Sequence, residues 1–292
     1  MKKEKEKKEV KKVVERYTIT VIGSGGTGTF FLKEFTHFLA RNQKAQECIH
    51  RLVIVDGDVV EEKNLDRQCF VREDVGMNKA ALFADILNGA MQQYGVSDSF
   101  KAKWEAYPNY VTSKDTLKEL MCDEDNGTYA ASLGKTSYDS CKGTLTLDIP
   151  IIIGCVDNNA ARLMMEEVFK ELDNCFLYDA GNEFRTGEVN YAHRLNGKTI
   201  SYEKSRSFPG MLSGDKRHVT EMSCTELNVS APQHFITNMT AGYHLLRGMV
   251  NLFSDMDKSI SERIKNQLGY VFFDSFSGLT DYTQRICKEQ DV

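Results

Sequence analysis

The sequence lacks several features that would assign it to a specialised class of protein. Only 4 of the 292 residues are proline, and no apolar run is long enough to span a bilayer. The formal net charge is -5, without the excess of basic residues that nucleic-acid-binding proteins usually carry. We therefore expect a globular protein that makes no membrane contact, and the composition argues against nucleic acid as a partner.

Paired cysteines are also absent. The 8 cysteines are scattered along the chain, and none of them forms a Cys-x-x-Cys pair. Such pairs are typical of structural zinc sites, and regularly spaced cysteines are typical of small disulfide-rich secreted proteins. The sequence therefore predicts neither a zinc site nor a disulfide framework.

Residues 1–16, MKKEKEKKEVKKVVER, lack the apolar segment of a secretory signal peptide. Their mixture of lysine and glutamate is typical of a solvated helix. We interpret these residues as a charged N-terminal arm, frayed and helical, and we expect a cytoplasmic protein.

Residues 17–292 read as a single domain whose first half alternates strands and helices. Apolar segments bounded by glycine or acidic residues predict the strands, and apolar residues at helical spacing predict the helices. This alternation is typical of a Rossmann-like, doubly wound α/β fold with a mainly parallel sheet. The expected strands are 17–23, 51–58, 99–107, 149–159 and 175–181, and the expected helices begin after Gly28 or span 79–95, 113–121 and 160–172.

The chain changes character after residue 183, where the nucleotide-binding half of the predicted domain (17–183) ends. Residues 185–195 predict a paired strand, and the polar residues that follow, up to 224, predict a crossover segment. Further on, 231–253 predict a long helix and 269–278 a strand. We therefore expect a strand pair with its crossover over 184–230. A C-terminal helix and strand over 231–292 would form a mixed or antiparallel extension of the sheet.

Four glycines follow the first expected strand: Gly23, Gly25, Gly26 and Gly28. They satisfy the pattern G-x-G-x-x-G between a strand and a helix, where the backbone turns tightly and phosphate binds at the helix N-terminus. A P-loop is excluded because no Gly-Lys-Ser/Thr follows. The pattern predicts a nucleotide site, and a glycine-rich turn without a ligand is the alternative.

Acidic residues follow two of the expected strands. Asp56 ends the second strand, where a carboxylate can accept both ribose hydroxyls of ATP or of NAD, and Asp58 is a second candidate for this position. Asp157 follows a central strand and is expected to point into the ligand crevice. Together with phosphate oxygens it could bind magnesium, although it could instead cap the helix that follows.

A set of polar and basic residues follows Asp56: Asn64, Arg67, Gln68 and Lys79. A dinucleotide site does not need these cations, whereas a triphosphate does, because arginine offers a bidentate fork and lysine a point charge. Lys79 opens a helix, which is unfavourable for a cation unless an anion lies nearby. The set therefore favours a triphosphate ligand over a dinucleotide.

The order of these segments closely resembles the ThiF/MoeB/E1 superfamily of adenylating enzymes. The resemblance extends over about residues 17 to 195, and the tail, SCTELNVSAPQHFITNMTAGYHLL, is similar to ThiF-like proteins of PRTRC-type systems. Four ordered motifs are far more specific than a glycine loop alone. The matching segments are GSGGTG (23–28), VDGDVVEEKNLDRQ (55–68), VGMNKA (75–80) and GCVDNNAAR (154–162).

The resemblance implies ATP and Mg²⁺ as cofactors and a role for each matching residue. Asp56 would bind the ATP ribose, Asn64, Arg67 and Lys79 would contact the phosphates, and Asp157 would bind magnesium. The glycines would line the nucleotide. The reaction would be adenylation of the C-terminal carboxylate of a ubiquitin-like or sulfur-carrier protein that ends in glycine.

A thiol can intercept the acyl adenylate that such a reaction forms. Cys224 is the candidate, since it lies at the end of the crossover segment, and in this superfamily a thioester-forming cysteine, where present, lies in or near such a segment. No neighbouring histidine or lysine indicates a lowered thiol pKa, so a buried structural cysteine is the alternative.

Two features of the superfamily are missing from this chain. The zinc-binding Cys-x-x-Cys pairs are absent, and so is the N-terminal RYxRQ segment that lends an arginine to a partner subunit. A homodimer is compatible with the resemblance, but the trans arginine has no counterpart. The remaining alternatives are an NAD(P)- or FAD-binding oxidoreductase, which would leave Arg67, Lys79 and Asp157 unexplained, and a catalytically silent nucleotide-binding scaffold.

Overall fold

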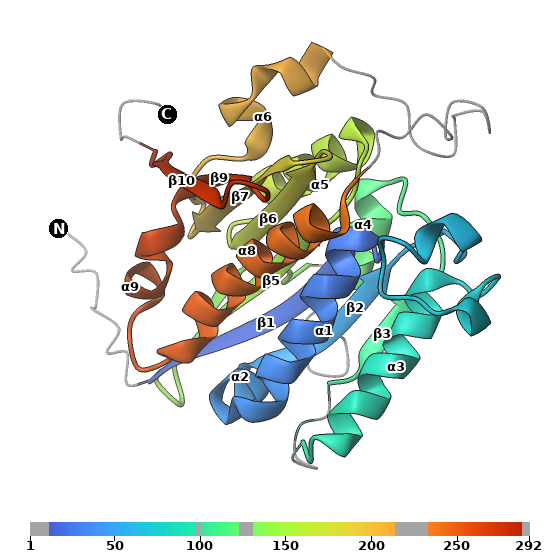
Figure 1. The fold of residues 1–292 in the computed structure, drawn as a ribbon. Helices are drawn as coiled ribbons and strands as arrows, with labels where there is room; N and C mark the ends of the chain where they lie inside the picture. Colours follow the sequence, from blue (N-terminus) through green and yellow to red (C-terminus); the bar gives the residue numbers. More distant parts are fainter. Residues whose placement is uncertain (1–11, 97–99, 101, 123–130, 214–232, 288–292) are drawn as a thin grey trace, which may run out of the picture.

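A ten-stranded sheet with helices on both faces forms the body of the protein (Figure 1). The computed structural model describes residues 12–96, 100, 102–122, 131–213 and 233–287. Strands lie in the order β10-β9-β7-β6-β5-β1-β2-β3, with β4 beside β5 and β8 beside β7. This arrangement confirms the predicted doubly wound α/β fold.

The nucleotide-binding half contributes parallel strands to the sheet. They are β1 (Lys12–Ile22), β2 (Ile49–Val55), β3 (Trp104–Tyr107), β5 (Thr144–Gly154) and β6 (Cys175–Asn182). β1 lies between β2 and β5, so the chain reverses its direction of progress across the sheet there. In open α/β sheets the ligand crevice forms at this reversal, at the carboxyl ends of the strands.

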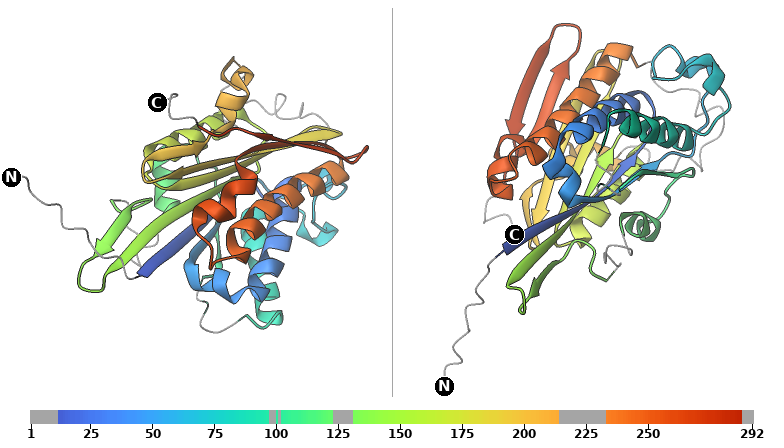
Figure 2. Two further views of the ribbon diagram at one scale, coloured as in Figure 1. Left: turned by 90° about the vertical axis from the view of Figure 1, so that its left-hand side faces the viewer. Right: turned by 90° about the horizontal axis from the view of Figure 1, so that it is seen from below.

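The other strands pair in antiparallel fashion and form the expected extension. They are β4 (Thr136–Asp139), β7 (Thr186–Leu195), β8 (Lys198–Ser201), β9 (Gly269–Asp274) and β10 (Leu279–Gln284). The β9–β10 hairpin closes one edge, and the β4–β5 hairpin projects beyond the helices (Figure 2). The predicted strand at 269–278 is thus a shorter strand, and β10 follows it as its partner.

Helices cover the two faces in separate layers. One face is covered by α1 (Gly26–Arg41), α2 (Gln43–Cys48), α3 (Lys79–Gln93), α8 (Phe235–Ser254) and α9 (Ile260–Ile264). The other face is covered by α4 (Lys114–Met121) and α5 (Asn159–Glu171). Short helical turns are η1 (Glu62–Asn64), η2 (Arg72–Asp74), α6 (Lys204–Ser207), η4 (Pro209–Ser213) and η6 (Lys265–Gln267).

Strand β2 shows how the sequence builds both layers at once. Successive side chains of a strand point to opposite faces, and every residue from Leu52 to Val55 is apolar. Leu52 and Ile54 pack into the core beneath α1, whereas Val53 and Val55 pack with α4 and α5. Each buried side chain of this size contributes about 1.5–3 kcal/mol to folding.

The helical arm expected over 1–16 is wrong for its last residues. β1 begins at Lys12 and pairs with β5 from Thr144 onward. The charged sequence tolerates the strand because Glu15 accepts hydrogen bonds from Arg263 of α9, one of them at 2.6 Å. The earlier residues of the arm lie outside the described residues.

The crossover segment begins with more regular structure than its polar sequence predicts, since β8, α6 and η4 occupy most of 198–213. The rest of the segment, with Cys224, lies outside the described residues. No helix in the described part of the chain has the length and apolar character needed to cross a membrane.

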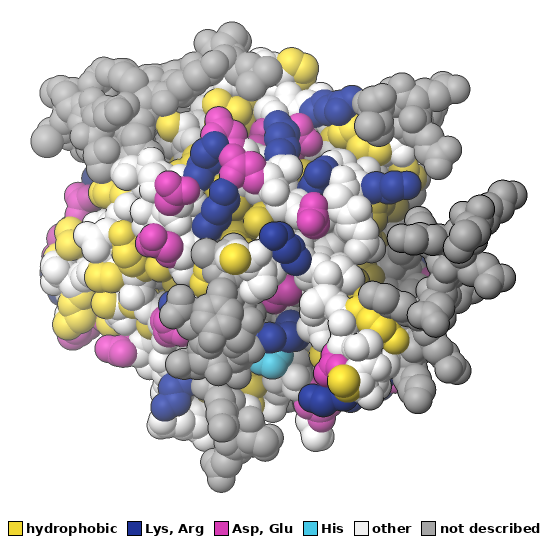
Figure 3. All heavy atoms as spheres, turned by 180° about the vertical axis from the view of Figure 1, so that it is seen from behind, with side chains coloured by type: hydrophobic (Ala, Val, Ile, Leu, Met, Phe, Trp, Pro, Cys, Tyr) yellow, Lys and Arg dark blue, Asp and Glu magenta, His cyan; other side chains and the backbone are white. Residues whose placement is uncertain are grey.

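Acidic and basic side chains alternate on the described surface seen from behind (Figure 3). On that side of the sheet, Lys114 of α4 and Glu171 of α5 form an ion pair at 2.7 Å. Mixed charges of this kind hold neighbouring helices together only weakly at the surface, and they create no broad field of one sign.

Candidate active site

A cavity of about 490 Å³ opens at the carboxyl ends of β1, β2, β5 and β6. This is where a doubly wound sheet binds its ligands. All but two of the predicted site residues line it: Gly23, Gly25, Gly26, Asp56, Asp58, Asn64, Arg67, Gln68, Lys79 and Asp157. The exceptions are Gly28, which packs beneath the loop, and Cys224, which lies outside the described residues.

The glycines of the loop lie in different environments, so a side chain would have a different effect at each of them. Gly23 has a φ of +95°, and a Cβ there would lie 2.5 Å from the carbonyl oxygen of Cys155. A Cβ on Gly28 would overlap the carbonyl of Gly23. On Gly25 a Cβ would meet nothing nearer than the Gln68 amide, at 3.7 Å, so this glycine faces the open cavity.

The first turn of α1 presents free backbone donors. Its N-cap, Gly25, offers no side-chain cap, and the turn contains no acidic residue. Within the described residues, the N–H groups of Gly26, Thr27 and Gly28 have no hydrogen-bond acceptor. A bare helix N-terminus of this kind favours an anion through both its N–H groups and the helix dipole.

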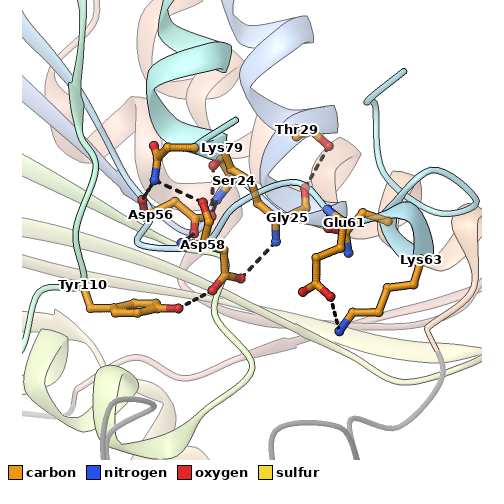
Figure 4. A network of polar contacts seen from close by, with 11 residues as sticks. Ser24, Gly25, Thr29, Asp56, Asp58, Glu61, Lys63, Lys79 and Tyr110 are labelled. Atoms are coloured by element: carbon orange, nitrogen blue, oxygen red, sulfur yellow. Dashed lines mark hydrogen bonds and ion pairs between the residues drawn. The ribbon is translucent and has the colours of Figure 1, made fainter. Parts of the chain in front are cut away.

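Asp56 holds the glycine loop in place (Figure 4). Its Oδ2 accepts hydrogen bonds from the Ser24 N–H, at 2.7 Å, and from the Ser24 hydroxyl, at 3.0 Å. Its Oδ1 accepts from the Asp58 N–H at 2.9 Å. Burial raises the pKa of this carboxyl despite the nearby Lys79 ammonium. Three of the carboxylate's lone-pair positions are therefore used within the protein.

Asp58 joins a lysine and a tyrosine at the cavity wall (Figure 4). The Lys79 ammonium lies 3.0 Å from Oδ2, and the Tyr110 hydroxyl donates to Oδ1. Although burial alone would raise it, the ammonium and the hydroxyl lower the pKa of Asp58. Lys79 is only 5% exposed, so it is not the surface lysine that its sequence context allowed. Asp58 provides the nearby anion that its helical position needs.

Asn64, Arg67 and Gln68 lie on the loop across the cavity from these acids. The Asn64 side chain accepts from the Glu61 N–H at 2.9 Å and so closes the η1 turn. Gln68 Oε1 is buried without a hydrogen-bond partner. In the part of the chain that the structure describes, the Arg67 guanidinium forms no ion pair. The loop therefore offers a cation that is not paired with any described acidic residue.

Asp157 is exposed at the cavity, three residues beyond β5. Its neighbour Asn158 is the N-cap of α5, since the Asn158 side chain accepts from the Ala161 N–H at 2.8 Å. The alternative role of Asp157 as the helix cap is therefore wrong. Its carboxylate accepts no hydrogen bond from the described residues, so it is available to a ligand.

Among the polar residues of the cavity wall that sequence reasoning did not assign to the site are Tyr110, Arg162 and Asn182. Arg162 is buried and donates to the carbonyls of Val156 and, at 3.1 Å, of Ala180, so it clamps the ends of β5 and β6 together. It ends the segment GCVDNNAAR, which is the signal that could have identified it.

The carboxylate of Asp179 also contacts Arg162. Asp179 of β6 lies 3.4 Å from its guanidinium and 3.6 Å from the Lys204 ammonium of α6. All three side chains are buried. A buried cation next to a buried carboxylate avoids the penalty of an unpaired charge, so this cluster ties the start of the crossover segment to the cavity floor.

The cysteines near the cavity are poor nucleophiles. Burial raises the pKa of the Cys155 thiol, and also that of Cys69. A thiol reacts as the thiolate, so neither cysteine is suited to nucleophilic attack. The described residues contain no group of three or more histidine, cysteine or acidic side chains that could hold a metal by themselves.

Known proteins resemble this chain in sequence and in fold. A curated relative is the ubiquitin-like modifier-activating enzyme 5 of Oryza sativa subsp. japonica, 25% identical over 171 residues, 58% of this chain but 33% of that protein. The chain therefore spans only a third of the length of this relative.

Solved structures extend the comparison to almost the whole chain. The structure of E. coli MccB with ATP has a TM-score of 0.56 at 13% sequence identity. The match covers 97% of this chain and 66% of the MccB chain. The microcin C7 biosynthetic enzyme MccB in complex with N-formylated MccA has a TM-score of 0.59 at 12% identity, with coverage of 97% and 67%. At this identity the likeness shows a shared fold.

The family comparison also extends over nearly the whole chain. The model of the ThiF family matches residues 4–284, which includes both halves of the sheet and every described wall of the cavity. The protein therefore belongs to the ThiF family.

Proposed function

We propose that this protein uses ATP to adenylate the C-terminal carboxylate of a small protein or peptide. One observation carries the proposal: one cavity is lined by the Gly26 and Thr27 amides, the Arg67 guanidinium and the Asp157 carboxylate, none of which has a partner among the described residues. Two of these groups attract phosphate, and the third suits a metal ion bound to phosphate. Membership of the ThiF family and the likeness to MccB with ATP support it.

The proposed phosphate site combines backbone donors with two cations. The N–H groups of Gly26 and Thr27 would donate hydrogen bonds to phosphate oxygens, and Arg67 would provide a bidentate contact. Lys79 is paired with Asp58 at 3.0 Å and also lines the cavity. The two cations would stabilise charge on the α-phosphate and on the leaving pyrophosphate.

Asp157 fits a magnesium ion. Mg²⁺ usually takes one or two carboxylates and completes its coordination with phosphate oxygens and water. An exposed, unpartnered carboxylate beside a phosphate site meets that need. When bound, the metal would neutralise phosphate charge.

The reaction needs no general base from the protein, since a C-terminal carboxylate is ionised at neutral pH. A carboxylate oxygen bonds to the α-phosphorus of ATP, the bond to the β-phosphate oxygen breaks, and pyrophosphate leaves. The chain's own contribution is to cancel the repulsion between two anions and to hold them in line.

We further propose a ubiquitin-like or sulfur-carrier protein ending in glycine as the substrate. The rice relative is named as an activating enzyme for a ubiquitin-like modifier, and MccB has been solved with MccA. Cys224 is proposed to attack the acyl adenylate and form a thioester with release of AMP, because of its place at the end of the crossover segment.

ATP–pyrophosphate exchange tests the first step directly. The purified chain is incubated with ATP, Mg²⁺, labelled pyrophosphate and ubiquitin-like proteins that end in glycine. Exchange should require the free carboxylate, so the same partners with an amidated C-terminus are the control. ATP binding without exchange for any free carboxylate would favour the nucleotide-binding scaffold instead.

The fate of the acyl group needs a second readout. Cys224→Ser should leave the exchange reaction in place and remove a thiol-sensitive adduct between the chain and its partner. Cys141→Ser is the matched control, since this thiol is exposed and remote from the proposed site. An adduct that persists in the Cys224 variant would contradict the thioester role.

A further inference from the structure

Asn238, in the first turn of α8, joins four separate parts of the cavity wall. Its side chain is fully buried, with 0% exposure. The Asn238 Nδ2 donates to the carbonyl of Arg67 at 3.2 Å, and its Oδ1 accepts from Asn182 Nδ2 at 2.6 Å. Asn182 Oδ1 in turn accepts from the Thr27 hydroxyl at 3.1 Å. One chain of hydrogen bonds therefore connects α8, the end of β6, the first turn of α1 and the Arg67 loop.

Packing holds the Asn238 amide against the glycine loop. A Cβ added to Gly26 would overlap this amide, so the α1 backbone and the Asn238 side chain are in direct contact. One helical turn later, a Cβ on Gly242 would lie 3.0 Å from Phe30 and 3.2 Å from the carbonyl of Thr27. Such close approach of two helices is possible only with small residues at the contact, and it leaves α8 little room to shift on α1.

The residue before Asn238 anchors the same turn on its other side. Thr237 donates to the carbonyl of Phe184 at 2.7 Å and also lies 2.7 Å from the Ser275 hydroxyl. These contacts reach the β6–β7 turn and the β9–β10 turn. The first turn of α8 is therefore held between the antiparallel extension and the cavity.

Arg67 needs such support because it lies on a loop. Arg67 follows η1 and lies outside any helix or strand, and its guanidinium has no ion-pair partner in the described chain. A flexible arginine binds an anion more tightly when its backbone is already fixed, since less conformational entropy is lost on binding. Asn238 supplies that fixation at the carbonyl of the same residue.

We propose that Asn238 is a positioning residue that fixes the Arg67 backbone relative to the α1 N-terminus, so that both face the same phosphates. The identity of the ligand rests on the proposed function, whereas the mechanical role does not. Asn238 does not line the cavity and acts only through Arg67 and the glycine loop.

The variants separate the two hydrogen bonds. Asn238→Ala removes both, whereas Asn238→Asp retains an acceptor for Asn182 and loses the donor to Arg67. Asn174→Ala is the matched control, because Asn174 is also 0% exposed and also makes two side-chain hydrogen bonds, to Thr136 at 3.1 Å and from the Asn196 N–H at 2.8 Å. Asn174 precedes β6, at the end of this strand that is opposite to the cavity.

Hydrogen–deuterium exchange measures the positioning without any ligand. Peptides covering 23–29 and 64–70 should exchange faster in both Asn238 variants and at the native rate in Asn174→Ala. Equal exchange in these peptides for the Asn238 variants and the control would overturn the proposal.

ATP affinity then tests the consequence for binding. Calorimetry should show Kd raised on the order of tenfold in the Asn238 variants, equivalent to about 1.4 kcal/mol. Combined with Arg67→Ala, the Asn238→Ala change should raise Kd by less than it does alone, because part of its effect passes through the Arg67 side chain. Additive losses would overturn the proposal. If the native chain binds no ATP, the proposed function fails, and hydrogen exchange alone decides the role of Asn238.

Discussion

The ends of β2 and β5 carry similar acidic residues in opposite states. At β2, Asp56 holds Ser24 and Asp58 holds Lys79 and Tyr110, so both carboxylates are already in use within the protein. At β5, Asp157 is exposed and has no hydrogen-bond partner among the described residues. Acids at the ends of neighbouring strands can thus differ in purpose: Asp56 and Asp58 build the site, whereas Asp157 remains available to a ligand.

The difference arises from the residues next to each acid. Asp56 lies directly beside a tight glycine turn whose N–H groups need an acceptor. Asp157 is followed by Asn158, which caps α5 and leaves the aspartate nothing to cap. An acid at a strand end is therefore free for catalysis only when a neighbour satisfies the local backbone.

Removal of the free acid should have the largest effect on activity. Asp157→Ala should lower the rate of ATP–pyrophosphate exchange by about 10²–10³-fold, the usual cost of removing one preorganised electrostatic group from an active site. The free energy of unfolding should change by less than about 0.5 kcal/mol, because the side chain has no partner to lose. Urea unfolding monitored by circular dichroism checks the second expectation.

An exposed aspartate outside the cavity serves as the control for this variant. Asp85 on α3 is also exposed, and Asp85→Ala should retain both exchange and stability. Native exchange rates in Asp157→Ala would remove the contrast between the two strand ends.

Replacement of Asp56, which is hydrogen-bonded within the protein at the end of β2, should lower the free energy of unfolding. Asp56→Ala leaves the Ser24 and Asp58 N–H groups without their acceptor, and a buried unpaired donor costs about 1–3 kcal/mol. Urea unfolding should show a loss of about 2 kcal/mol, reduced by the relief of a buried charge. A variant as stable as the native chain would mean that Asp56 is held for the ligand alone.

The smallest expected effect is on the pH dependence of the free energy of unfolding, which should have opposite signs for Asp56 and Asp58. Burial raises the pKa of Asp56 above the usual 3.8, so its contribution to stability grows as the pH falls through that raised pKa. The pKa of Asp58 is lowered, so its contribution is complete above about pH 4 and disappears as the pH falls through the lowered pKa. Unfolding of the native chain, Asp56→Asn and Asp58→Asn between pH 3 and 7 should therefore give differences of opposite slope.

The sequence predicted the parallel half of the fold well because its signals are local. The helix over 79–95 is observed as Lys79–Gln93, and the strand over 175–181 as Cys175–Asn182. β1 was predicted too short, because a charged strand stabilised by Arg263 from a distant helix has no local apolar signature.

The candidate site was predicted in its residues but not in their partners. The glycine loop, Asp56, Lys79 and Asp157 follow from their places at strand and helix ends, and the cavity brings them together. Tyr110 and Asn238 carry no such signal. Asn238 is 171 residues from Arg67, so only the fold places the two side by side.

Gly25 offers a practical use of the cavity that its neighbours do not. Its φ of -79° lies outside the left-handed region, and a Cβ there would meet no protein atom nearer than 3.7 Å. Gly25→Cys would therefore place a thiol on the cavity wall without disturbing the loop, with the exposed Cys141 replaced by serine so that it does not react in its place. A fluorophore attached there would report ligand entry optically, and the same position would accept a covalent inhibitor.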